Sequence, residues 1–343
     1  MNTLRLTVFD VEKDRENLNK AAEILKNGGL VGIPTETVYG LAANTFNEEA
    51  ISNIFKAKGR PQDNPLIVHV SDMEMVKELV SDLPEKAKVC AEKFWPGPFT
   101  MVLPRGDKVP KSVSAGLDTV AVRMPSNPVA HELIKVSRLP LAAPSANLSG
   151  SPSPTTADHV LFDLDGRIDA VIVSDKCDVG LESTVISLCC EPPRLLRPGG
   201  VTLEQLQEVL PDIVVDKAVL AQPEKDKPVA SPGMKYKHYS PKARVIMLDG
   251  EFDKFKKYVA DHTEDGTFAL VFDGEEKELS VPSVLFGHKG DESEQAAVLF
   301  DALRELDNLG CKLCFARVPQ KSGIGLAVYN RLIRAAAFEV IAL

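Results

Sequence analysis

The chain has 343 residues and a formal net charge of −9, with 44% hydrophobic and 26% charged residues, which is typical of a globular protein of two domains. No apolar run is long enough to span a bilayer, so we expect a cytoplasmic protein without membrane association. The acidic balance also argues against stable binding of long nucleic acids, because proteins that bind them usually carry an excess of positive charge.

Hydrophobic periodicity over residues 1–215 predicts one mixed α/β domain. Strands are expected over 30–34, 66–70, 99–103, 119–124, 170–174, 184–188 and 194–197. Helices are expected over 15–27, 50–58, 85–94, 128–136 and 202–210. Thr202 precedes the last helix with Gln205 three residues on, which is the spacing of a capping box.

Residues 216–242 differ from their surroundings, because they are rich in proline and lysine and carry a local basic excess. Long connections of this kind are usually functional or disordered. Residues 243–343 then alternate strands with helices, which predicts a small, parallel, Rossmann-like sheet. Its strands are expected over 244–248, 268–272 and 311–318, and its helices over 252–260, 294–309 and 326–341.

Four segments of the first domain offer groups suited to anionic ligands. The segment 34–41 follows a strand and is expected to open a helix, with Thr35 as its cap and free N–H groups beyond it. Lys58 and Arg60 end the helix 50–58, where they either complement the helix terminus or face a site. Arg123 lies near the end of a strand, where it is either a surface residue or a partner for a carboxylate.

The fourth segment, residues 143–154, is a loop of small polar residues between two patterned strands. Ser145, Asn147 and Ser153 supply hydroxyl and amide groups there without bulk, as phosphate sites require. Further along the chain, Ser183 and Arg197 add one hydroxyl and one guanidinium. No phosphate-binding loop, dinucleotide fingerprint or kinase signature is present in the sequence, so any nucleotide must be bound by a different kind of site. Cys311 and Cys314 have the spacing of a redox or zinc pair, but no second pair stands at zinc spacing, so packed, reduced thiols are the better interpretation.

Taken together, these segments resemble a YrdC-type domain over nearly the whole first domain. The Lys-x-Arg of Lys58 and Arg60 and the later Ser-x-Asn of Ser145 and Asn147 match the core signature of that family. The tyrosine-containing linker 216–242 and the α/β tail are similar to the long, two-domain form of threonylcarbamoyl-AMP synthase. The resemblance implies a YrdC-like twisted mixed sheet followed by a small Rossmann-like domain.

The resemblance also implies a reaction in which L-threonine, bicarbonate and ATP give threonylcarbamoyl-AMP and pyrophosphate. The product would feed threonylcarbamoyladenosine modification of tRNA beside the anticodon, through tRNA threonylcarbamoyl transferase proteins. By the same resemblance, Lys58 and Arg60 would be the catalytic cations. Threonine would be held by Thr35, His69, Arg123 and Ser183, and ATP by Lys58, Thr119, Ser145, Asn147, Ser153, Arg197 and Tyr239. A buried, structural histidine is an equally good interpretation of His69.

The chemistry fits these residue types. A carbamate nucleophile is already anionic, so no general base is needed, and cations must instead offset its repulsion from the triphosphate. Magnesium is expected to be carried mainly by ATP and water. The linker 216–242, with Tyr239, is expected to act as a lid that excludes water.

Three other functions remain open at this stage. The first domain could bind RNA by shape with a concave face, although interleaved aromatic residues are lacking. The chain could adenylate a different carbamate, as in hydrogenase maturation, or act as a scaffold in a tRNA-modifying complex without chemistry of its own. Intact Lys58, Arg60, Ser145 and Asn147 favour an enzyme over a scaffold.

Overall fold

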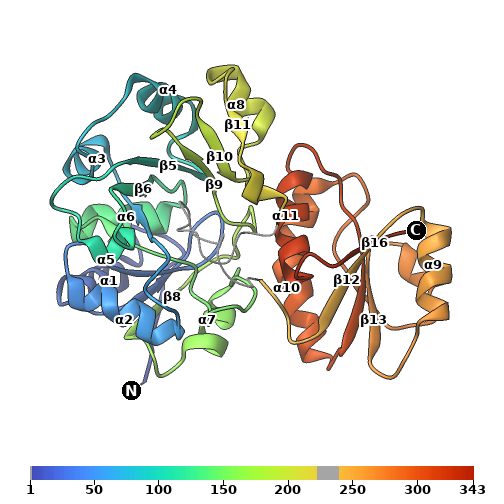
Figure 1. The fold of residues 1–343 in the computed structure, drawn as a ribbon. Coiled ribbons are helices and arrows are strands. Elements are labelled where there is room, and N and C mark those ends of the chain that lie inside the picture. The colour runs from blue at the N-terminus through green and yellow to red at the C-terminus, as the bar shows by residue number, and fades with distance from the viewer. Residues whose placement is uncertain (1, 222–238) are drawn as a thin grey trace. The chain divides into compact units, whose positions relative to one another are not determined.

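The computed structural model describes residues 2–221 and 239–343, which form two compact units (Figure 1). The first unit holds residues 2–149 and 153–219, and the second holds 150–152, 220–221 and 239–343. Most of the expected lid, residues 222–238, lies outside the described residues. Across the two described ranges, the helices fall short of the length and apolar character that crossing a bilayer demands.

A long mixed sheet forms the centre of the first unit. Within the described chain its strand order is β1-β8-β2-β3-β7-β4-β6-β5-β9-β10-β11. The strands are β1 (Leu4–Thr7), β2 (Val31–Ile33), β3 (Gly40–Asn44), β4 (Ile67–His69), β5 (Phe99–Pro104), β6 (Thr119–Arg123), β7 (Leu141–Ala142), β8 (Ala170–Val173), β9 (Thr184–Ser187), β10 (Arg194–Arg197) and β11 (Val214–Val215). The expected mixed α/β class of this domain is therefore confirmed.

Helices bury apolar residues against both faces of this sheet. The first unit contains α1 (Arg15–Lys26), α2 (Glu48–Lys58), α3 (Met73–Leu79), α4 (Glu85–Phe94), α5 (Lys111–Ser114), α6 (Pro128–Ser137), α7 (Ala157–Leu164), α8 (Leu203–Val209) and the short 3₁₀ helix η1 (Lys217–Val219). Helices α1 and α6 share one core with β1, β2 and β8. Helices α2 and α7 contribute to the core on the other face, and α4 and α8 cover the far strands β5, β9 and β10.

The ends of these helices follow from local sequence. The Asn47 side chain accepts from the Ala50 N–H and caps α2, while Gly59, with φ of 61°, ends it in the left-handed region that favours glycine. The predicted capping box of α8 is confirmed, because the side chains of Thr202 and Gln205 each bond the other's backbone N–H.

The second unit is a parallel sheet with the strand order β14-β13-β15-β12-β16 in the part of the chain described. Its elements are β12 (Arg244–Asp249), α9 (Phe252–Asp261), β13 (Thr267–Val271), the 3₁₀ helix η2 (Glu275–Glu278), β14 (Ser283–Leu285), α10 (Glu292–Asn308), β15 (Leu313–Arg317), α11 (Gly325–Ala335) and β16 (Val340–Ala342). Helix α9 lies on one face of the sheet, and α10 and α11 lie on the other (Figure 1). The small Rossmann-like domain predicted from the sequence is confirmed.

One predicted element of this unit is wrong in its second half. The helix expected over 326–341 ends at Ala335, and the chain then passes through Ala337 and Phe338, both with positive φ, into β16. Strand β16 pairs with β12 in parallel, so backbone pairing with a neighbouring strand outweighs the helical pattern of the last residues.

Candidate functional site

The segment between β2 and β3 is a tight turn, not the start of a helix as the sequence suggested. Strands β2 and β3 pair antiparallel, with Ile33 opposite Gly40, so the chain must reverse between them. The buried Thr35 Oγ1 accepts from the N–H groups of Thr37 and Val38, each at 3.2 Å, and donates to the Val38 carbonyl. Thr35 thus closes a side-chain turn, and no helix N-terminus is present to receive an anion.

Arg123, the residue predicted for a carboxylate, is buried and already faces one. Its Nη2 lies 2.7 Å from Glu36 Oε1, its Nη1 donates to Thr37 Oγ1 at 2.7 Å, and its Nε donates to the Gly97 carbonyl. The side chains of Arg123 and Glu36 are only 4% and 7% exposed, which excludes a surface role for Arg123. Glu36 and Thr37 were not singled out from the sequence, although they lie inside the motif that was.

Burial acts to raise the pKa of Glu36. Attraction to Arg123 and hydrogen bonds from Arg123 and the Ser126 amide outweigh it, so the pKa lies below its ordinary value and Glu36 is charged. A guanidinium has five donors; Nε donates to Gly97, Nη1 donates to Thr37, and Nη2 is ion-paired with Glu36. Both terminal nitrogens thus have donor capacity left for a ligand.

Strand register places three site residues in one row. His69 lies opposite Arg123 across β4 and β6, and Thr100 lies opposite Arg123 across β5 and β6. Directly opposed residues project from the same face of a sheet, so these three side chains are neighbours. The Thr100 hydroxyl lies 2.8 Å from the Ser183 hydroxyl, and this contact extends the row to the start of β9.

Arg197 joins the same group from β10. Its Nε donates to the Ser183 carbonyl at 3.0 Å and its Nη2 to the Ser183 hydroxyl at 3.2 Å. The structure therefore brings Thr35, His69, Arg123 and Ser183, the four residues predicted for threonine, into one buried polar cluster. It also adds Arg197, which was predicted for ATP.

His69 is a neutral histidine within this cluster. Burial and the neighbouring positive charge of Arg123 lower its pKa to about 3, and Glu36 opposes this only in part. Among the described residues, its Nδ1 has no hydrogen-bond partner. A buried ring nitrogen of this kind is available to a ligand, whereas a structural histidine would normally have both nitrogens satisfied.

We expect the His69 ring to show no titration between about pH 5 and pH 8, in contrast to ordinary histidines. Its folded pKa lies below the unfolded value, so its contribution to stability is complete above about pH 6.5 and declines as the pH falls toward 3. Nuclear magnetic resonance of the histidine ring protons measures this directly. His288 is the internal control, since Glu294 raises its pKa, and titration of His69 near pH 6.5 would contradict the burial argument.

Lys58 belongs to a second group of residues, those predicted to bind ATP. It is the last residue of α2, and its buried ammonium donates to the carbonyls of Ser145 and Asn147 at 2.5 and 2.6 Å. Burial, and secondarily the nearby Arg60, hold the Lys58 pKa well below its ordinary value, against the opposing attraction of Asp163 and Glu182. Lys58 therefore does not project into solvent, and it fixes the loop that carries the Ser-x-Asn motif.

That loop is tied to the Thr35 turn. Ser145 bridges to Gly40, and the Ala146 N–H donates to the Tyr39 carbonyl at 2.8 Å. The Ser145 hydroxyl donates to Asn147 Oδ1 at 2.6 Å. These bonds place the Lys58 group directly beside the segment that carries Thr35.

Two further contacts complete the group predicted for ATP. Ser153 donates to Glu182, the residue immediately before Ser183, and so links the loop to the Arg123 cluster. Arg60 lies over the Phe55 ring and donates to the Asn64 carbonyl. Glu182, like Glu36, was not predicted, because single carboxylates carry no recognisable sequence pattern.

Thr119 lies apart from these groups, and Tyr239 belongs to the other compact unit. Thr119 begins β6 while Arg123 ends it, which separates them by about 13 Å. Thr119 instead lines a separate depression with Cys189, Arg194 and Asp216. Tyr239 belongs to the second unit, where its ring packs against Phe300 at 5.3 Å with the Arg331 guanidinium over it.

Both parts of the chain match models of known protein families. A family model described as telomere recombination, which covers the Sua5, YciO and YrdC proteins, matches residues 23–199. The model of the threonylcarbamoyl-AMP synthase C-terminal domain matches residues 201–337. The threonylcarbamoyl-AMP synthase of Pyrococcus abyssi is 44% identical over 94% of both chains, and that of Bacillus subtilis is 45% identical over 94% of this chain and 93% of its own.

This chain belongs to the threonylcarbamoyl-AMP synthase family. The resemblance seen in its motifs is thus confirmed, including the two-domain form. The crystal structure of P. abyssi Sua5 complexed with L-threonine is 40% identical, covers the whole of both chains and superposes with a TM-score of 0.91. A family member with this fold has therefore been solved in complex with L-threonine.

Proposed function

We propose that this protein is an L-threonylcarbamoyladenylate synthase, a nucleotidyltransferase that condenses L-threonine, bicarbonate and ATP into threonylcarbamoyl-AMP with release of pyrophosphate. The observation that carries the proposal is the hydrogen-bonded cluster around Arg123, which joins directly onto the Lys58 group through the Thr35 turn and the Ser153–Glu182 contact. Membership of a family whose P. abyssi member binds L-threonine supports the assignment.

In this proposal the Arg123 cluster holds threonine. The terminal nitrogens of Arg123 bind the amino-acid carboxylate, while Glu36 and Thr37 fix the orientation of the arginine. The neutral His69 and the hydroxyls of Thr35 and Ser183 bond the rest of the amino acid. A neutral His69 avoids an additional buried positive charge beside Arg123.

ATP lies on the Lys58 side of the site, with Ser145, Asn147, Ser153 and Arg197 as contacts and Arg60 close by. The carbamate oxygen attacks the α-phosphate, so the attacking group is an anion that approaches a polyanion. One cation about 4 Å from a unit charge contributes roughly 4 kcal/mol at an effective dielectric constant near 20. Lys58, Arg60 and Arg197 are the cations that would offset this repulsion.

Magnesium is proposed to reach the site on ATP. Glu36 Oε1 is paired with Arg123 and Glu182 accepts from Ser153, so each of these two carboxylates already has a protein partner. A metal that keeps phosphate and water ligands fits such a site better than one that requires a protein cage. When bound, the ion would neutralise charge on the phosphates.

The cellular role belongs to the same proposal. The adenylate would supply threonylcarbamoyl transferase proteins that modify tRNA, in the cytoplasm. Tyr239 is proposed to contact phosphate as part of a lid over residues 216–242, although residues 222–238 lie outside the described structure.

The proposal is tested by incubating the protein with ATP, L-threonine and ¹³C-labelled bicarbonate and identifying the products by mass spectrometry. We expect a threonylcarbamoyl adenylate that carries one labelled carbon, formed together with pyrophosphate. Replacing L-threonine with L-alanine is the control, since it lacks the hydroxyl. Release of pyrophosphate without label in an adenylate would overturn the assignment, and binding of structured RNA in its place would favour the RNA-binding alternative.

A further inference from the structure

The second unit contains a cavity of about 350 Å³ at the edge of its parallel sheet where the strands end. Its walls are the segment 249–251 after β12 and the segment 317–321 after β15, with Phe272, Lys289 and Gln295. This volume lies within the range of small-molecule sites, about 300–1,000 Å³. All of these residues belong to the second unit, whereas the Arg123 cluster belongs to the first.

Sheet topology makes this edge a natural ligand site. Strands β15 and β12 are neighbours, but the chain leaves them in opposite directions: β12 leads through α9 to β13, and β15 leads through α11 to β16. Helices α9 and α11 consequently lie on opposite faces of the sheet (Figure 1). The two chain segments that diverge here form the cavity wall, and in open α/β sheets ligands bind in such crevices.

Helix dipoles supply positive potential to the cavity, whose lining also includes the Glu251 carboxylate at the start of α9. Helices α9, α10 and α11 all begin at this edge of the sheet, so the positive ends of their dipoles are directed toward it. Of these, α9 and α11 receive no side-chain cap, whereas Asp291 caps α10. Backbone N–H groups at uncapped helix starts are suited to phosphate oxygens.

The positively charged side chains of the cavity wall differ in whether a carboxylate neutralises their charge. Arg317 is buried and paired with Glu275, and Lys321 is paired with Asp249. Lys289 is exposed and has no ion-pair partner within residues 2–221 and 239–343. Lys289 is therefore the cation whose charge is available to a ligand.

A second, independent feature of the cavity is a buried amide whose acceptor is unsatisfied. Gln295 is 1% exposed and lines the cavity, and its Nε2 donates to the His288 carbonyl at 2.7 Å. That bond fixes the orientation of the amide, and Oε1 then has no partner in the described parts of the chain. A buried acceptor without a donor is costly, so a ligand hydroxyl or amino group that donates to it would be favoured.

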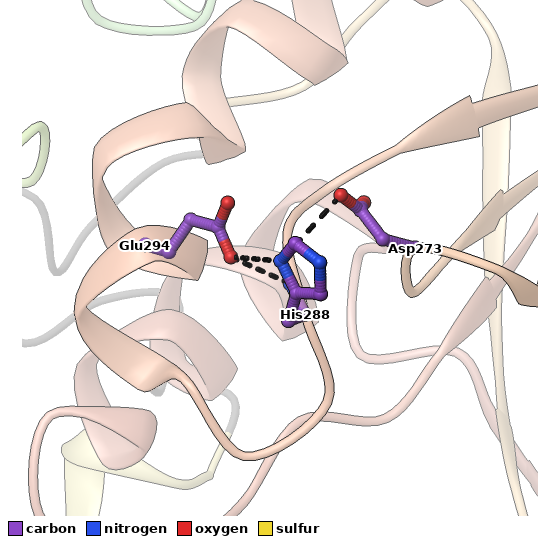
Figure 2. A group of neighbouring side chains, drawn as sticks. All are labelled: Asp273, His288 and Glu294. Atoms are coloured by element: carbon purple, nitrogen blue, oxygen red, sulfur yellow. Dashed lines mark hydrogen bonds and ion pairs between the residues drawn. The ribbon is translucent and has the colours of Figure 1, made fainter.

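The wall that carries Lys289 is held by three side chains. Figure 2 shows the His288 ring between Glu294 and Asp273. His288 Nδ1 lies 2.7 Å from Glu294 Oε2 and 3.6 Å from Asp273 Oδ2, and Glu294 also accepts from the His288 N–H. This cluster fixes the segment before α10 to both α10 and the end of β13, which positions Lys289 and supports the Gln295 amide.

We propose that this cavity binds a phosphate monoester of up to mononucleotide size. The phosphate lies against Lys289, on the side of the cavity where α9 begins. The remainder of the molecule lies along Phe272, with a hydroxyl or amino group on Gln295. This site is additional to the proposed synthase site and does not depend on it.

The test measures binding of inorganic phosphate, ribose 5-phosphate and AMP to the full chain by calorimetry, in the absence of threonine and bicarbonate. Lys289→Glu is the test variant, and Lys277→Glu is the matched control, because Lys277 is also exposed in the second unit but does not line the cavity. We expect Lys289→Glu to weaken ribose 5-phosphate and AMP about tenfold or more through reversal of one charge, and Lys277→Glu to leave both unchanged.

The three probes separate possible sources of affinity. Tighter binding of AMP than of ribose 5-phosphate would identify a nucleotide, and equal binding would identify a sugar phosphate. Equal affinities in the two variants would overturn the proposal. This is also the result expected if AMP binds only to the first domain. The proposal would also be overturned if none of the three probes showed saturable binding at millimolar concentration. Neither result would bear on whether the protein makes the adenylate.

Discussion

Replacing Arg123 with alanine is expected to abolish threonine-dependent pyrophosphate release and to lower the free energy of unfolding by about 3–5 kcal/mol, because Glu36 is left as a buried, uncompensated charge. The affinity for threonine should fall far more than the affinity for ATP. Chemical denaturation measures the first quantity, and calorimetric titration with each substrate measures the second.

Two further variants separate stability from binding. Arg123→Ala combined with Glu36→Gln removes both members of the ion pair and should recover most of the stability without recovering threonine binding. Arg5→Ala, at an exposed position on β1, controls for the loss of an arginine as such. Equal weakening of threonine and ATP in the single variant would mean that Arg123 acts only as a structural residue.

Lys58→Met is expected to lower the rate of pyrophosphate release by about 10²–10³-fold, the range seen when one preorganised donor is removed from a transition state. Methionine keeps the length of the buried stem but leaves the Ser145 and Asn147 carbonyls without their shared donor. The loop that carries the Ser-x-Asn motif should then lose its fixed position. Steady-state measurement of pyrophosphate at saturating ATP and threonine gives the rate.

The matched control for this variant lies two residues earlier. Lys56 is on the same last turn of α2 but is exposed and bonds only Asn53 among the contacts described for it. Lys56→Met should therefore retain wild-type turnover. If both methionine variants lost activity equally, the effect would belong to the end of α2 and not to the Lys58 ammonium.

Elements with strong local signals were predictable from the sequence alone. The bounds of α4 and β10 agree with prediction, because a helical period that ends before Trp95-Pro96 and a short strand after Pro192-Pro193 are both defined locally. Elements that depend on distant partners were missed. The short strands β1 and β16 form only because neighbours far along the chain pair with them, β14 is three residues long, and α3 and α7 are each under nine residues long.

The same distinction holds for the site. The motif residues Thr35, Lys58, Arg123 and Asn147 could be picked out because their types and spacing are distinctive. Their partners could not, since the Arg123–Glu36 pair and the Thr100–Ser183 contact join strands and turns that only the folded register brings together. Nothing local to Thr35 distinguishes a helix cap from the side-chain turn that it forms, as both use its hydroxyl to accept backbone N–H groups.

The row formed by His69, Arg123 and Thr100 has an implication for how this family can change over time. Successive side chains of a strand project to opposite sides, so deletion of a single residue within β6 would turn the guanidinium away from its two neighbours and bury it among apolar groups. The lengths of β4, β5 and β6 are therefore under as much constraint as the identities of the residues they carry. Substitutions elsewhere in these strands should be tolerated where insertions and deletions are not.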